Sequence, residues 1–151
     1  MGHHPFLNLC TSLCGVAGVV ASELVQGRNG TASASMQVDG VKVTLAHVPE
    51  QVPGGVLVLV ELGSIPCDRE LPIMLALLDA NFLMPSENSA SIGRSPVGGE
   101  AILQSCWLLD DIDGPSAHAK LSQMTQFVRT WQRDHFLDAA GQPAVQIACV
   151  A

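Results

Sequence analysis

Hydrophobic residues between Asp68 and Met84 repeat with the period of an α-helix, and they occupy two sides of it. Asp68 is a suitable N-cap, Pro72 falls in the first turn, where a missing N–H is tolerated, and Pro85 follows the end of the pattern. A helix that is apolar on nearly all sides is normally buried. One stripe consists of Leu71, Met74, Leu75, Leu78 and Phe82, and the other of Ile73, Leu77, Ala80 and Met84.

This central helix predicts a partner. A small two-layer domain covers only one side of such a helix, and the simplest cover for the other side is a second copy of the chain. The alternative is a helix enclosed within a single larger core. We predict a homodimer whose interface is the second stripe, namely Ile73, Leu77, Ala80 and Met84.

A second helical pattern runs from Pro5 to about Gln26. Gly15 and Gly18 weaken it by roughly 1 kcal/mol each relative to alanine. No charged residue occurs between Pro5 and Ser22, so the outer face of this helix is only weakly polar. Its apolar stripe comprises Phe6, Leu9, Leu13, Val16, Val20 and Leu24.

Three strands are predicted between the two helices. Ser35–Val38 and Val41–Val48 flank Asp39-Gly40, a strong signal for a two-residue hairpin turn. Val56–Leu62 is apolar on both sides and predicts a central strand covered on two faces.

The remaining pattern predicts a second hairpin and a last helix. Ala90–Arg94 and Ala101–Leu108 form the hairpin, and Pro115 opens the helix. Ala144–Val150 has no assignable type. The fold class is α+β, in the order helix, three strands, helix, two strands, helix, with a twisted antiparallel sheet packed with helices. We expect one domain over residues 1–136, followed by a C-terminal extension over residues 137–151.

Composition and charge narrow the function. The chain has 151 residues, 7 Lys+Arg against 14 Asp+Glu, and a net charge of −7. Such a chain lacks the basic stripe that nucleic acids or anionic membranes require. Five cysteines without a regular framework favour a reduced cytoplasm. Leu7–Ala21 could instead be a signal-peptide core, although it lacks a basic start.

Catalytic and metal-binding signals are weak. No HExxH, zinc-finger, P-loop or GxSxG spacing occurs, so we expect no metal, cofactor or catalytic set. Cys10 and Cys14 lie one helical turn apart and are better explained by packing than by a metal or redox bridge. Asp110, Asp111 and Asp113 precede a helix, whose N-terminus acidic residues stabilise, and this explanation outweighs a Ca²⁺ or Mg²⁺ site.

From about Val56 to Phe136 the chain resembles the CesT/Tir-chaperone family, the class I chaperones of bacterial type III secretion. The resemblance lies in the strand ending Leu62–Pro66, the helix segment Met74–Asn81, the Ser91-Ile92-Gly93 hairpin, and the last helix with Leu121, Phe127 and Trp131. The family's first helix usually has a charged outer face, which this chain lacks. The resemblance implies a small acidic cytoplasmic homodimer that binds an N-terminal segment of a secreted effector and keeps it soluble and secretion-competent without nucleotide.

Two functional hypotheses follow. In the first, the chain is an effector-binding chaperone with an apolar groove. The groove residues are Phe6, Leu9, Leu13, Val16 and Val20 of the first helix, with Val43 and Leu45 of the sheet. The alternative for these residues is that the helix merely covers the sheet. In the second, it is a small enzyme or carrier whose site gathers distant polar residues, with His47, His118 and Asp110–Asp113 as first candidates.

Overall fold

The computed structural model describes residues 4–21, 23–84 and 90–144. The chain forms two compact units, the first comprising Met1–Val60 and Cys106–Thr125, the second Glu61–Ser105 and Gln126–Ala151. Its elements are α1 (Pro5–Ala17), β1 (Glu23–Gln26), β2 (Ala32–Val38), β3 (Val41–His47), β4 (Gly55–Gly63), the 3₁₀ turn η1 (Cys67–Arg69), α2 (Glu70–Leu83), β5 (Ser91–Arg94), β6 (Ala101–Leu108), the 3₁₀ turn η3 (Leu109–Asp111) and α3 (Gly114–Asp134).

The strands form one antiparallel sheet in the order β1-β2-β3-β4-β6-β5. The predicted α+β class is therefore confirmed. The predicted number of strands before the central helix was three, and the structure has four. The additional strand, β1, lies at one end of the strand order, and β5 lies at the other.

In the first unit, α1 ends much earlier than its apolar pattern predicts. Gly18 adopts a left-handed conformation (φ 68°) after Ala17, and the Val19 N–H donates to the Cys14 carbonyl. Such a left-handed residue terminates a helix. The expected extension to Gln26 is therefore wrong, and the last four residues of that range pair with β2 as a strand.

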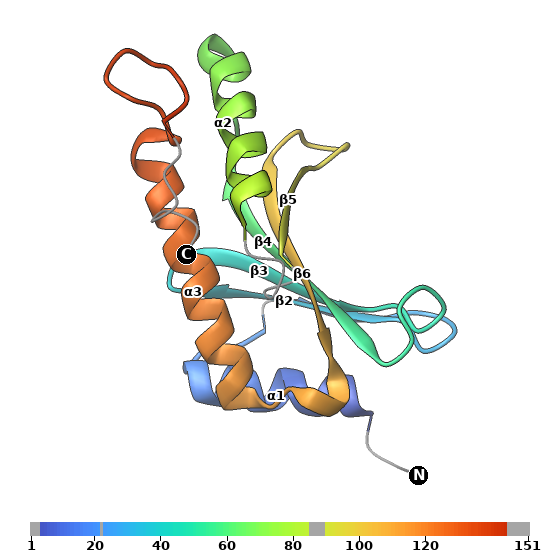
Figure 1. Ribbon diagram of the computed structural model, residues 1–151. Coiled ribbons are helices and arrows are strands. Elements are labelled where there is room, and N and C mark those ends of the chain that lie inside the picture. The colour runs from blue at the N-terminus through green and yellow to red at the C-terminus, as the bar shows by residue number, and fades with distance from the viewer. Residues whose placement is uncertain (1–3, 22, 85–89, 145–151) are drawn as a thin grey trace. The chain divides into compact units, whose positions relative to one another are not determined.

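The β2–β3 hairpin is confirmed (Figure 1). Its turn residues Asp39 and Gly40 both have positive φ, as a two-residue turn that matches strand twist requires. Side chains alternate along both strands, and the inward positions of the hairpin, among them Met36, Val43 and Leu45, are fully buried.

The central strand β4 is also confirmed. Val56, Val58, Val60 and Leu62 are fully buried, whereas the alternate residues from Leu57 onward are half-buried. Both faces of the strand are thus at least partly covered, which agrees with its near-continuous apolar sequence.

In the second unit, α2 follows directly on η1 and lies beside β5 (Figure 1). Asp68 belongs to the 3₁₀ turn, and the residue at the N-cap position is Arg69, which makes no side-chain cap; the predicted capping by Asp68 is therefore wrong. Pro85, the predicted stop, lies outside the described residues. The β5–β6 hairpin is confirmed, with Arg94 paired to Ala101.

The last helix begins as predicted. The Ser116 N–H donates to Asp113 Oδ1 at 2.8 Å, and this hydrogen bond holds the pKa of Asp113 below its usual value. The helix ends where His135 and Phe136 both take positive φ. Most of the predicted tail segment, residues 145–150, lies outside the described residues.

Candidate interaction surfaces

The two apolar stripes of α2 have different environments. Ile73, Leu77 and Ala80, which were expected to form the dimer interface, are at most 5% exposed and lie in the core of the second unit together with Ala76. These three side chains are therefore already covered within the single chain, which argues against the second stripe as the dimer interface. Met84 is half-buried and follows the end of the helix. The exposed side chains, which we call the α2 stripe, are 45–87% exposed and comprise Leu71, Leu75, Leu78 and Phe82.

The stripe predicted to face a partner is buried instead, and this has a physical cause. Ala76 and Ala80 are small, so they allow the helix to pack closely with the side chains between them buried. Both sides of the helix are apolar, so sequence periodicity finds two stripes but does not tell which is inward.

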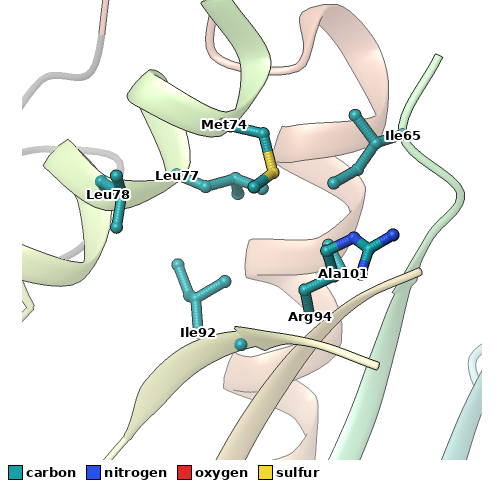
Figure 2. Close-up of a pocket in the computed structure, with 8 residues that line it drawn as sticks. Ile65, Met74, Leu77, Leu78, Ile92, Arg94 and Ala101 are labelled. Carbon is teal, nitrogen blue, oxygen red and sulfur yellow. The ribbon is translucent and has the colours of Figure 1, made fainter. Parts of the chain in front are cut away.

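A groove lies between α2 and the β5–β6 hairpin, within the second unit. Figure 2 shows Met74, Leu77 and Leu78 of the helix facing the groove opposite Ile92. The guanidinium of Arg94 is the charged group in a lining that is otherwise apolar. Because Leu78 lines the groove and also belongs to the α2 stripe, the two form one continuous apolar surface. The other lining residues are Ile65, Gly93 and Ala101.

A second set of exposed apolar side chains lies in the first unit, from the last turn of α1 to β1. Val20 is 86% exposed, and the other three members of the set are about half exposed. All four occur within ten residues of sequence, and we call them the N-terminal apolar set: Val16, Val20, Leu24 and Val25.

Most of the residues predicted to bind an effector are part of the core instead. Phe6, Leu9 and Leu13 of α1 are at most 5% exposed, and Val43 and Leu45 of β3 are fully buried. The burial of these five residues favours the alternative interpretation, in which the first helix covers the sheet, over their assignment to a client surface. Of the predicted binding set, Val16 and Val20 remain exposed.

From the sequence, Leu24 was assigned to the helical stripe and Val25 to no surface, because Val20 and Leu24 continue the helical spacing of α1 by coincidence. A signal for the strand was nevertheless present. Glu23–Gln26 contains the β-branched Val25, follows the possible helix stop at Gly18, and is followed by the turn sequence that begins at Gly27.

The two ends of the sheet differ in how their backbone edge is covered. At the β5 end, the Ile92 N–H donates to Asn81 Oδ1 of α2 at 2.9 Å. At the β1 end, all four residues from Glu23 to Gln26 are exposed. An uncovered edge strand can pair with another extended chain, whereas one whose N–H groups are occupied is protected.

Two of the polar residues considered for a catalytic or metal site, His47 and Asp113, have structural roles. His47 is buried, its Nδ1–H donates to the Gly55 carbonyl at 2.9 Å, and its ring stacks on Phe6. Asp113 caps α3, as described above. Asp110 and Asp111 belong to η3, and His118 lies half-buried on α3. Within residues 4–21, 23–84 and 90–144, no three His, Cys, Asp or Glu side chains are placed to hold a metal ion.

Burial keeps the cysteine pair on α1 in the thiol form. Burial raises the pKa of the Cys10 thiol to about 12, with the neighbouring Cys14 adding to the effect, and burial also raises the pKa of Cys14. A raised pKa leaves little thiolate, which is the form that binds metals and attacks disulfides. The packing interpretation of these residues is therefore favoured.

Known proteins resemble this chain in structure, but no match was found by sequence. No protein-family model matches the chain, and no curated protein matches it. Among the helices that the structure describes, none has the length and apolar character needed to cross a bilayer.

Several solved structures share the fold. A chain of the ExsC–ExsE complex matches with a TM-score of 0.64 at 21% identity, over 88% of this chain and 96% of that one. The type III secretion chaperone SycH of Yersinia pestis, in complex with a fragment of YscM2, matches with a TM-score of 0.56 at 14% identity, over 85% and 98% of the two chains. A chain of the HopA1–SchA chaperone–effector complex matches with a TM-score of 0.57 at 14% identity, over 86% and 94%.

Proposed function

We propose, from the premise that this chain has the fold of the class I type III secretion chaperones, that it binds a segment of a secreted effector and keeps that effector soluble and secretion-competent. The client segment is extended and N-terminal in the effector, and the chaperone acts as a homodimer in the bacterial cytoplasm. The observation that carries this proposal is the open β1 edge with exposed apolar side chains beside it, on a chain with this fold.

The β1 region supports the binding of an extended client. Edge pairing supplies affinity through main-chain hydrogen bonds that any client sequence can make, and apolar contacts with alternate side chains supply specificity. Val20 provides such a contact close to this end of the sheet. Because these contacts cover apolar side chains of the client, they also protect it from aggregation.

The α2 stripe supports association with a second copy. Two identical helices can pack against each other around a two-fold axis, which makes one apolar stripe self-complementary. Burying a large aliphatic or aromatic side chain contributes about 1.5–3 kcal/mol, so four of them on each copy supply a substantial driving force. The groove beside Leu78 extends this surface and can accept side chains of the second copy.

The surface charge is consistent with these roles. The net charge of −7 keeps an otherwise apolar chain soluble, and it disfavours nucleic acid as an alternative partner. The Arg94 guanidinium at the groove makes no ion pair within residues 4–21, 23–84 and 90–144, and it can donate hydrogen bonds to a carboxylate of the second copy.

Purification of the native protein from its source cells tests the proposal. Native mass spectrometry should detect two copies of this chain bound to one secreted protein, and limited proteolysis should show that an N-terminal segment of that protein is protected. Repeating the purification with Val20→Asp should reduce the recovered client, whereas Leu108→Asp, at another exposed apolar position in the first unit, should leave it unchanged. A chain recovered alone, or with a client that survives Val20→Asp, contradicts the proposal.

A further inference from the structure

Strand β1 is held in the sheet without any buried side chain. Its four residues pair with β2, from Glu23 opposite Ser35 to Gln26 opposite Ala32, and all four are exposed. On β2, in contrast, Ala32, Ala34 and Met36 are buried. Buried apolar contacts supply most of the stability of a strand, and segments with few of them open at low free-energy cost. β1 is therefore a weakly attached strand on a firmly attached neighbour.

The turn that joins the two strands keeps β1 close when it opens. The Gly27 N–H donates to the Thr31 carbonyl at 2.9 Å, and the Thr31 N–H donates to the Arg28 carbonyl at 3.1 Å. Asn29 and Gly30 both adopt positive φ, as a tight turn requires. A tethered strand has a high effective concentration at its own pairing site, so β1 competes with any other chain for the edge of β2.

The edge of β2 suits many incoming sequences. The four residues opposite β1, Ala32 to Ser35, are all alanine or serine. Small side chains leave space next to a neighbouring strand, so the backbone of an incoming segment can approach whatever side chains it carries.

We propose that β1 is a displaceable cover and that the extended client segment replaces it on the edge of β2, rather than adding to the outside of β1. The identity of the incoming strand rests on the proposed function. During the exchange, one set of main-chain hydrogen bonds is lost and an equivalent set is formed. The balance is therefore decided by side chains, and a client strand that buries apolar side chains displaces one that buries none.

The other end of the sheet is unsuited to this exchange. The outer edge of β5 carries the hydrogen bond from the Ile92 N–H to Asn81 of α2, and removing it would leave a half-buried side chain without its partner. The two ends therefore have distinct roles, with one edge fixed and the other exchangeable.

The first test uses the free protein, without any client. Amide hydrogen exchange of the full chain should be much faster in peptides covering β1 than in peptides covering β3, whose alternate residues Val41, Val43 and Leu45 are buried. Equal protection of β1 and β3 would overturn the proposal, because a cover that does not open cannot be exchanged.

The second test uses a probe that contains the natural strand. A fluorescent synthetic peptide with the sequence of residues 20–27 should bind to the edge of β2 in place of β1. In the variant Val25→Cys/Ser33→Cys, oxidation joins two residues that face each other in the register and locks β1 in place. We expect peptide affinity to fall by about tenfold or more on oxidation, because affinity scales with the fraction of molecules in the open state.

The control locks a different pair of strands. Gln37 and Lys42 are exposed and face each other on β2 and β3, so oxidised Gln37→Cys/Lys42→Cys should bind the peptide as well as its reduced form does. Undiminished binding to the locked β1 variant, no binding to its reduced form, or an equal loss in the control would each overturn strand exchange. A client that binds normally to the locked variant would refute the exchange and leave the proposed function standing, whereas peptide exchange without any effector client would refute the proposed function alone.

Discussion

The α2 stripe and the N-terminal apolar set are both exposed and apolar, but the backbone behind them is held in different ways. The stripe belongs to a regular helix whose opposite side is anchored by Ile73, Leu77 and Ala80 in the core. The N-terminal set begins in the last turn of α1 and includes two residues of a strand with no buried residue. A pre-formed surface loses little conformational entropy on binding and suits a permanent partner, whereas a weakly held edge suits a partner that comes and goes. The difference explains why we assign the second copy to one surface and the client to the other.

The largest expected effect comes from placing a charge on the inner side of α2. Leu77 is 5% exposed in the isolated chain, so Leu77→Asp buries an unpaired carboxylate within the second unit. We expect a loss of at least about 3 kcal/mol in the free energy of unfolding, a large part of the stability of a domain of this size. Urea denaturation followed by circular dichroism measures it. A folded, stable Leu77→Asp protein would show that Leu77 is a surface residue after all.

The same substitution one residue further along should act on assembly instead of folding. Leu78 is 63% exposed, so Leu78→Asp should leave the free energy of unfolding of the monomer nearly unchanged and weaken the dimer by roughly 2–4 kcal/mol, or about 30-fold to 1,000-fold in dissociation constant. Sedimentation equilibrium measures the change. Val97→Asp is the matched control, because Val97 is exposed in the same unit but belongs to the turn between β5 and β6 and not to α2. A dimer that is unaffected by Leu78→Asp would place the interface elsewhere.

The chain order and most elements could be predicted from the sequence, because their signals are local. Asp39-Gly40 specifies the β2–β3 turn, and the acidic residues with Pro115 specify the start of α3. The functional surfaces could not be assigned, because burial depends on contacts between distant segments. On α1, Phe6 and Leu13 fit a client groove and a core equally well until the sheet is in place.

The end of α1 shows the same limit on a smaller scale. Val20 and Leu24 extend the apolar period, and a single glycine in a helical pattern is a weak stop signal. The left-handed conformation of Gly18 decides the outcome, and the chain beyond it pairs with β2. The missed strand is the element on which the candidate client site depends, so this local error had a large effect on the functional assignment.

A smaller effect is expected for the N-terminal apolar set. Val20→Asp should weaken binding of the recovered client by about tenfold, which corresponds to about 1.4 kcal/mol, because one exposed contact is lost and a charge is placed beside it. The dimer should be unchanged, since Val20 lies outside α2. Isothermal titration calorimetry with the client segment measures the affinity, and gel filtration of the same sample measures the assembly. A simultaneous loss of dimer and client would mean that the two surfaces are not separate.

The smallest effect concerns the difference between the two sheet edges. Asn81→Ala removes the acceptor of the Ile92 N–H and should lower the free energy of unfolding by about 1 kcal/mol, the usual contribution of one hydrogen bond. The amide of Ile92 should then exchange faster with solvent, while the amides of β1 keep their rate. The control is Gln104→Ala, which removes an exposed side-chain hydrogen bond to Ser91 Oγ in the same hairpin and should change stability by less than about 0.5 kcal/mol. Because Asn81→Ala uncovers β5, we also expect the variant to aggregate more readily through that edge. If the Ile92 amide keeps its protection in Asn81→Ala, other contacts cover the β5 edge, and the contrast between a fixed and an exchangeable edge no longer depends on this asparagine.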